Sequence, residues 1–257
     1  MNIREFGTEK YPIRSSSIPL LMTCSWRATM IAMKLMDDSV GAAADTGSAV
    51  HKAIESMHHT GKAFDDCIMD ATAAQSKYPK VDWNEVRLHF RGYFDDPRNT
   101  AAKILAYETQ FKTQISEAGV DWTLQGTFDQ IRLDKGRRMC YDIKTGSRCD
   151  AYETLMNHTL QLAAYWIGAE TLGYSLDGVG IIYTYGYRKR GAELPSPTGV
   201  FLPHPMSRSD CTLLMKGVSR RIQSIRNGEI DIVPGTHCNV CPARSVSVCI
   251  PLYKEKF

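Results

Sequence analysis

Three residues in the middle of the chain have the types and spacing to bind a divalent cation and hydrolyse a phosphodiester. Asp129 ends a Gly-Thr-Phe-Asp motif, and Asp142 and Lys144 form an Asp-Ile-Lys motif a short distance later. Two carboxylates held close together repel each other unless a cation lies between them, and their hard oxygens favour Mg²⁺ or Mn²⁺. A lysine beside them would orient or deprotonate a water molecule. An isolated Asp-x-Lys is also common on solvated surfaces, so the alternative is a polar hairpin without function.

A β-hairpin would bring these residues together. Residues 121–133 and 137–145 show the alternation of strands, and Asp134-Lys135-Gly136 between them is a turn sequence. A turn centred between Lys135 and Gly136 continues into a ladder that places Asp129 directly opposite Asp142. Directly opposed Cβ atoms lie roughly 4.5–5.5 Å apart, and Lys144 shares the face of Asp142 because strand side chains alternate. A register shifted by one residue would break this arrangement.

The elements around the hairpin indicate an α/β fold. The sequence predicts helices over 25–36, 46–58 (capped by Asp45) and within 64–94, a strand over 105–115, a helix over 154–172, a strand over 179–187, a loop over 188–199 and a helix over 207–227. This order favours a mixed central sheet flanked by helices. We expect one domain over residues 1–257, with a mainly helical part at 15–95 and a cysteine-containing tail at 229–257.

The composition is that of an ordinary globular protein. The 257 residues are 43% hydrophobic and 23% charged, and the net charge of +3 says little by itself about nucleic acid. The chain contains no apolar run long enough to span a membrane, and its N-terminus lacks the apolar segment of a secretory signal. We therefore expect a cytoplasmic protein with no membrane partner. In that compartment the eight cysteines stay reduced, so clustered ones are read as metal ligands.

Four motifs occur in the order found in the RecB-like nucleases of the PD-(D/E)XK superfamily, and the sequence resembles that family over roughly residues 15–250. The family carries a Gly-Thr-x-x-His type helix, a Gly-x-x-Asp strand, an Asp-x-Lys strand and a Gln-x-x-x-Tyr helix. The corresponding residues here are His51, Asp129, Asp142 with Lys144, and Gln161 with Tyr165, and Glu108 follows Tyr107 as a further family element. One departure is Phe128, which stands before Asp129 where the superfamily name has proline.

The resemblance implies a restriction-endonuclease-like fold and a role for each motif residue. The implied metal ligands are His51, Asp129, Asp142, the carbonyl of Ile143 and, as an outer ligand or structural partner, Glu108. Lys144 would activate water or stabilise the phosphate, Gln161 would position Lys144 or the DNA, and Tyr165 would support that helix face. Without the resemblance, His51 could form an ordinary helical pair with Glu55, and Gln161 and Tyr165 could be capping and core residues.

The cysteines predict a second inorganic site. Cys238, Cys241 and Cys249 lie close together near the C-terminus and need a fourth ligand to complete a site. In the iron–sulfur nucleases that the sequence resembles, one cysteine precedes the catalytic core, and Cys24 matches it. The resemblance therefore implies a [4Fe-4S] cluster that ties residue 24 to the tail. A zinc ion on the same four thiolates and plain buried cysteines are the alternatives, and Cys67, Cys140, Cys149 and Cys211 are expected to be structural.

The sequence thus predicts a Mg²⁺- or Mn²⁺-dependent DNA exonuclease acting on DNA ends in recombination, repair, or phage- or CRISPR-related processing. Arg188, Lys189 and Arg190 are candidates for gripping DNA, although short charge runs are usually solvated loops. The chain lacks a Gly-x-x-x-x-Gly-Lys-Ser/Thr motif, so unwinding would need a partner helicase. A single-strand annealing protein or a CRISPR-adaptation protein is an equally expected partner. The alternative class is a non-catalytic DNA- or partner-binding module with a structural zinc or iron–sulfur site.

Overall fold

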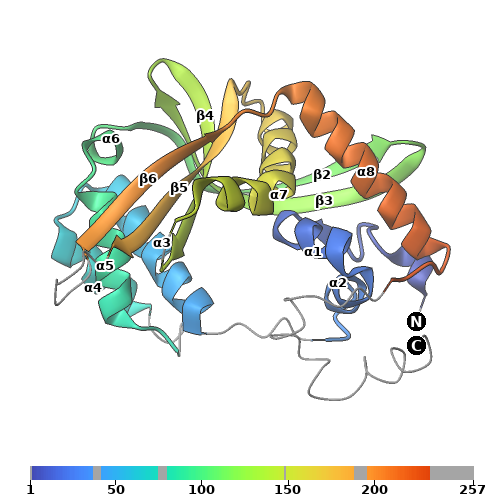
Figure 1. The fold of residues 1–257 in the computed structure, drawn as a ribbon, viewed down its shortest axis with the longest axis horizontal. Coiled ribbons are helices and arrows are strands. Elements are labelled where there is room, and N and C mark those ends of the chain that lie inside the picture. The colour runs from blue at the N-terminus through green and yellow to red at the C-terminus, as the bar shows by residue number, and fades with distance from the viewer. Residues whose placement is uncertain (1, 37–41, 75–79, 148, 188–195, 232–257) are drawn as a thin grey trace.

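The computed structural model describes residues 2–36, 42–74, 80–147, 149–187 and 196–231, and within them the chain forms a six-stranded mixed sheet flanked by helices (Figure 1). The sheet order is β1-β3-β4-β5-β6, and β2 pairs with the other edge of β3. The strands are β1 (Ile13–Arg14), β2 (Lys103–Glu117), β3 (Val120–Asp134), β4 (Arg137–Gly146), β5 (Gly178–Tyr187) and β6 (Ser196–His204). The predicted α/β fold with a mixed central sheet is confirmed.

The helices cover both faces of the sheet. They are η1 (Ile3–Glu5), η2 (Ser15–Ser17), α1 (Ile18–Thr23), α2 (Ser25–Ala32), α3 (Ala42–Thr60), α4 (Phe64–Ala73), α5 (Trp83–Phe94), α6 (Pro97–Thr100), α7 (Ala151–Thr171) and α8 (Arg208–Arg226). Strand β4 shows how the two cores divide, because its side chains alternate. Cys140 packs with α7 and α8, whereas Tyr141 and Ile143 pack with α3, α4 and α5. In Figure 1 the helices α3 to α5 accordingly lie at the opposite end of the molecule from α1, α2 and α8.

The predicted β3–β4 hairpin has the predicted register. Lys135 and Gly136 form a two-residue turn with φ values of +51° and +80°, as a turn of type I′ requires. The ladder runs from Asp134↔Arg137 to Gln130↔Tyr141 and ends there. The next pair would be Asp129 and Asp142, so the ladder stops just where the two aspartates begin.

Three local predictions were wrong. The predicted loop 188–199 overlaps β6, an edge strand that pairs with β5. Pro197 and Pro203 made this segment look unlike a strand in the sequence. An edge strand can accommodate proline because one side of its backbone needs no hydrogen-bond partner. Asp45 does not cap α3, which begins at Ala42; its carboxylate instead accepts a hydrogen bond from the backbone of Lys80. Asp150 caps α7, so that helix begins at Ala151 rather than at residue 154.

The first residues of the C-terminal tail lie beside Cys24. That cysteine is buried at the junction of α1 and α2, and the Ser25 hydroxyl exchanges hydrogen bonds with the backbone of Asp231. Trp26 N also donates to Asp231 O, at 3.2 Å. Cys238, Cys241, Cys249 and the basic residues 188–190 lie outside the described residues. No helix in the described part of the chain is long and apolar enough to cross a membrane.

Candidate active site

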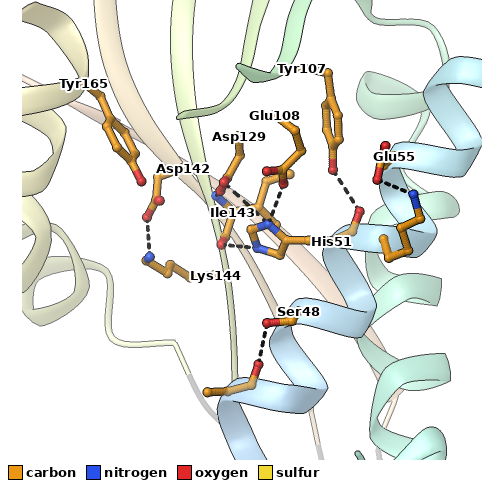
Figure 2. A network of polar contacts seen from close by, with 12 residues as sticks. Ser48, His51, Glu55, Tyr107, Glu108, Asp129, Asp142, Ile143, Lys144 and Tyr165 are labelled. Atoms are coloured by element: carbon orange, nitrogen blue, oxygen red, sulfur yellow. Dashed lines mark hydrogen bonds and ion pairs between the residues drawn. The ribbon is translucent and has the colours of Figure 1, made fainter. Parts of the chain in front are cut away.

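The candidate site lies where β3 and β4 separate. Beyond the last ladder pair, the Asp129 carboxylate accepts a hydrogen bond from the backbone N–H of Ile143, so a side chain replaces the next backbone contact between the strands. Asp142 and Lys144 follow on β4, and His51 approaches from α3 (Figure 2). The turn fixes the register of the hairpin, and the register in turn brings the two acidic motifs to the same place.

His51 is surrounded by three oxygen atoms. Its Nδ1 lies 3.1 Å from Glu108 Oε1 and 3.5 Å from Asp129 Oδ1, and its Nε2 lies 3.0 Å from the carbonyl oxygen of Ile143. Burial lowers the pKa of His51, but the negative charges of Asp129 and Glu108 outweigh that effect and raise it to about 9. At neutral pH the ring is therefore an imidazolium that donates from both nitrogens. A cation already lies among these oxygens.

Glu108 reaches this cluster from an unusual backbone conformation. Its φ is +43°, in the left-handed region that non-glycine residues rarely adopt, while Tyr107 and Thr109 on either side keep their pairing with β3. Such a conformation costs on the order of 1–3 kcal/mol and persists where surrounding contacts enforce it. One such contact is nearby, since the Tyr107 hydroxyl donates to the backbone carbonyl of His51 at 3.0 Å. Strand β2 and helix α3 are thereby joined at the site.

Asp142 has a different set of partners. It is 1% exposed, and the Lys144 ammonium lies 2.9 Å from its Oδ2, although without the geometry of a hydrogen bond. Gln161 Nε2 donates to Asp142 Oδ1 at 3.4 Å and to the Tyr165 hydroxyl at 2.7 Å. Burial lowers the pKa of Lys144, but the charges of Asp142 and Asp129 raise it above its ordinary value. Lys144 is therefore a cation held beside Asp142, and Asp142 Oδ2 accepts no hydrogen bond from the described residues.

The acidic groups fit a divalent cation. Burial raises the pKa of Asp129 to about 7, against the effect of His51, and the charges of Asp142 and Glu108 also raise it. Ligand atoms of His51, Glu108 and Asp129 all lie within 4.8 Å of one another. Carboxylate and carbonyl oxygens with one imidazole form a donor set that suits Mn²⁺ and Mg²⁺. A cation among these three residues would relieve the repulsion between the carboxylates of Asp129 and Glu108. Asp142 lies beside this group, with its Oδ2 facing the Lys144 ammonium.

A cavity of about 610 Å³ opens onto this site between α3, β2 and β4. Beside the predicted residues its walls include Gln110, Thr127, Thr145 and Glu55. Sequence reasoning did not assign a role to Gln110 or Thr127. Period-two alternation from Glu108 and Asp129 could have found both, because Gln110 and Thr127 are cross-strand partners.

The structure thus gathers eight predicted site residues at one place: His51, Glu108, Asp129, Asp142, Ile143, Lys144, Gln161 and Tyr165. Cys24 is not among them and lies at the α1–α2 junction. The predicted ligands Cys238, Cys241 and Cys249 and the basic residues 188–190 lie outside the described residues.

The model of the PD-(D/E)XK nuclease superfamily matches residues 15–249. A protein of Eubacterium rectale, named as a candidate exonuclease, superposes with a TM-score of 0.56 at 12% identity, over 90% of this chain and 87% of that one. The crystal structure of SSO0001 gives a TM-score of 0.40 at 16% identity, over 77% and 82% of the two chains. No curated protein matches significantly. At such low identity the Eubacterium rectale structure supports the fold alone.

Proposed function

This chain belongs to the PD-(D/E)XK nuclease superfamily, and we propose that it is a Mg²⁺- or Mn²⁺-dependent DNA exonuclease that hydrolyses phosphodiester bonds at DNA ends. The observation that carries the proposal is the convergence of Asp129, Asp142 and Lys144 at the point where β3 and β4 separate. The name of the Eubacterium rectale protein, which has a similar fold, supports the exonuclease part of the proposal.

The residues that would hold the metal are Asp129, Asp142, His51 and the Ile143 carbonyl, with Glu108 as an outer or direct ligand. A bound divalent ion would polarise the phosphate and promote deprotonation of the attacking water. His51 must lose a proton to serve as a metal ligand. The carboxylates that raise the pKa of His51 would then stabilise the positive charge of the metal ion in place of that proton. In the metal-free site the imidazolium partly balances the same carboxylates.

Lys144 would act on the phosphate or on the nucleophile. Because it is a cation held by Asp142 alone among the described ion pairs, its ammonium can turn toward an incoming phosphate and stabilise the charge that develops there. Gln161 would position Asp142 through its amide, and Tyr165 would hold Gln161 through the 2.7 Å contact. These two residues are positioning residues in this proposal.

We also propose that Cys24, Cys238, Cys241 and Cys249 bind a [4Fe-4S] cluster. The support is the anchoring of Asp231 beside Cys24, because it brings the tail to that cysteine only seven residues before Cys238. A cluster there would stabilise the fold by closing a long loop. Anaerobically purified protein should contain iron and sulfide and absorb at about 400 nm. One zinc ion per chain without iron would replace this proposal by a zinc site.

The biological setting is part of the same proposal. The protein would work in the cytoplasm of a bacterium, or of a phage-infected host, on DNA ends made during recombination, repair or CRISPR adaptation. Residues 188–190 would contact DNA, and a single-strand annealing protein, helicase or CRISPR-adaptation protein would be the partner.

The test is digestion of end-labelled linear DNA and of circular DNA with Mg²⁺ or Mn²⁺. Wild type and a variant with exposed Lys216 on α8 replaced by alanine should degrade the linear DNA and leave circles intact, and Lys144→Ala should not. Cleavage of circles would show an endonuclease instead. A folded protein that digests nothing with any metal would favour the alternative, a non-catalytic DNA- or partner-binding module.

A further inference from the structure

The cavity at the candidate site continues along β2 and β3. It shares Gln110 and Thr127 with a second cavity of about 660 Å³, which is also lined by Ser15, Gly126 and Tyr165. The second cavity occupies an open interval of the sheet. On that edge of β3, β1 pairs only with Leu124 and Gln125, and β4 begins its pairing at Gln130. The two cavities together form a hollow that starts at the candidate metal ligands. It follows β3 along the residues that pair with neither β1 nor β4.

At the far end of this hollow three side chains form a row across three strands. Arg14 of β1 is in register with Gln125 of β3, and Gln125 is in register with Lys112 of β2. Registered neighbours point to the same face of a sheet. This face is the outer one, because the preceding residues Ile13 and Leu124 are buried in the core. All three residues of the row line the second cavity and a third one that adjoins it, of about 600 Å³.

The row differs in charge from the candidate metal site. Arg14 and Lys112 are the only ionisable residues among the described walls of the second cavity apart from Tyr165, and both are cations. Arg14 forms no ion pair with another described residue, and Lys112 is paired only with Glu9, at 2.9 Å. The side chains of Lys112 and Glu9 are 46% and 75% exposed, so the pair is weak and a phosphate can compete for the lysine. Asp129 lies four residues after Gln125 along β3, a distance of about 13 Å at ~3.3 Å per residue.

We propose that Arg14, Gln125 and Lys112 bind the sugar-phosphate backbone of the DNA strand that enters the site, a few nucleotides from the bond that is cut. The inference rests on the proposed function and deepens it, because it assigns the path of the substrate strand. Two cations and an amide donor along a continuous hollow match a run of phosphodiesters, which carry one negative charge per nucleotide. Such contacts act on affinity for longer substrates and leave the bond-breaking step to the residues around Asp142.

The test measures binding of a fluorescent oligonucleotide in the absence of divalent metal, so that its outcome does not depend on cleavage. Arg14→Gln and Lys112→Gln should each weaken binding several-fold and reduce the slope of log K against log salt by about 0.7 on a single strand, or about 0.9 on a duplex. Parallel titrations with single-stranded and duplex probes then identify which form occupies the row. In cleavage assays both variants should raise KM for long substrates, keep kcat, and leave a dinucleotide substrate unaffected.

A charge change of the opposite sign separates this proposal from simple destabilisation. Glu9→Gln releases Lys112 and should tighten oligonucleotide binding two- to three-fold, whereas a damaged surface would weaken it. The matched control is Asp65→Asn, which opens the similarly exposed Arg87–Asp65 pair on α4 and α5 and should change nothing. Unchanged binding in Glu9→Gln, Arg14→Gln and Lys112→Gln would overturn the proposal. If Arg14→Gln and Lys112→Gln weaken DNA binding but the wild-type protein cuts no DNA, the proposed strand path stands and the proposed exonuclease activity is refuted.

Discussion

Helix α3 carries two histidines on one face, His51 and His58, in opposite electrostatic surroundings. His51 contacts Glu108 and Asp129, and its pKa is raised to about 9. His58 Nε2 lies 2.7 Å from the Tyr93 hydroxyl, and its ring contacts Tyr107. Burial lowers the pKa of His58 to about 4, and the charge of Arg132 acts in the same direction. One ring is a cation at neutral pH, and the other is neutral.

The difference comes from the partners and not from the helix. Seven residues are two turns, so both rings face the sheet. At His58 the core of α3, α4 and α5 offers hydroxyl and aromatic groups, and the Tyr93 hydroxyl donates its proton to Gln130 Oε1 at 3.3 Å. At His51 three acidic side chains, Glu108, Asp129 and Asp142, face only two basic ones, His51 and Lys144. His58 therefore lies among uncharged protein partners and has a structural role, whereas the surroundings of His51 have the excess of negative charge that a metal ion would balance.

The largest expected effect separates the two histidines by activity. His51→Ala should lower the rate of DNA cleavage by about 10²-fold or more, because the loss of a metal ligand should cost at least as much as the loss of a residue that only supports one. His58→Gln retains a hydrogen-bonding side chain beside Tyr93 and should stay within a few-fold of wild type. Rates measured under single-turnover conditions with Mn²⁺ would check both. Equal losses in the two variants would mean that the contrast has no functional meaning.

Metal-linked stability gives a second contrast. Saturating wild-type protein with Mn²⁺ at one hundred times its Kd should raise the free energy of unfolding by about 2.7 kcal/mol. His58→Gln should keep this gain, and Asp129→Asn should lose most of it, since the amide has the shape of the carboxylate without its charge. Urea unfolding with and without Mn²⁺ measures the gain. Stabilisation of Asp129→Asn as large as that of wild type would place the ion elsewhere.

The smallest expected effect is the pH dependence of stability at His58. Its pKa is about 4 in the folded protein and near 6.5 in an unfolded chain, so the unfolded state binds more protons between these values. The stabilising contribution is complete above pH 6.5 and is lost as the pH falls toward 4. Between pH 7 and pH 5 this should cost about 1–2 kcal/mol more in wild type than in His58→Gln. Parallel urea titrations at the two pH values measure the free energy of unfolding of each protein. An equal change between pH 7 and pH 5 in wild type and His58→Gln would show that His58 is not held neutral.

The sequence predicted the parts of the site that depend on local rules. The turn at Lys135 and Gly136 has only a few compatible ladders, so the hairpin register could be predicted, and the motif order led to His51, Lys144 and Gln161. Other features depend on tertiary pairing. The positive φ of Glu108 has no signal in its own sequence, and the neutral state of His58 depends on Tyr93 and Arg132, which are distant along the chain.

The row on the outer face was missed for a related reason. Arg14 belongs to a two-residue strand, too short to show alternation, and only its parallel pairing with β3 brings it beside Gln125. Basic residues in the sequence were sought as runs, such as 188–190, whereas Arg14 and Lys112 are nearly a hundred residues apart. Long-range strand pairing creates this cluster, and no local pattern records it.

The most direct measurement is anomalous diffraction from crystals soaked in Mn²⁺, with Asp129→Asn crystals as the control. We expect a manganese peak in contact with the carboxylates of Asp129 and Asp142 in the wild type, with His51 turned from an imidazolium into a neutral ligand, and a much weaker peak in the variant. Saturating Mn²⁺ that leaves this site empty, with the His51 contacts to Glu108 and Ile143 unchanged, would contradict the central claim that these residues form a metal-dependent nuclease centre.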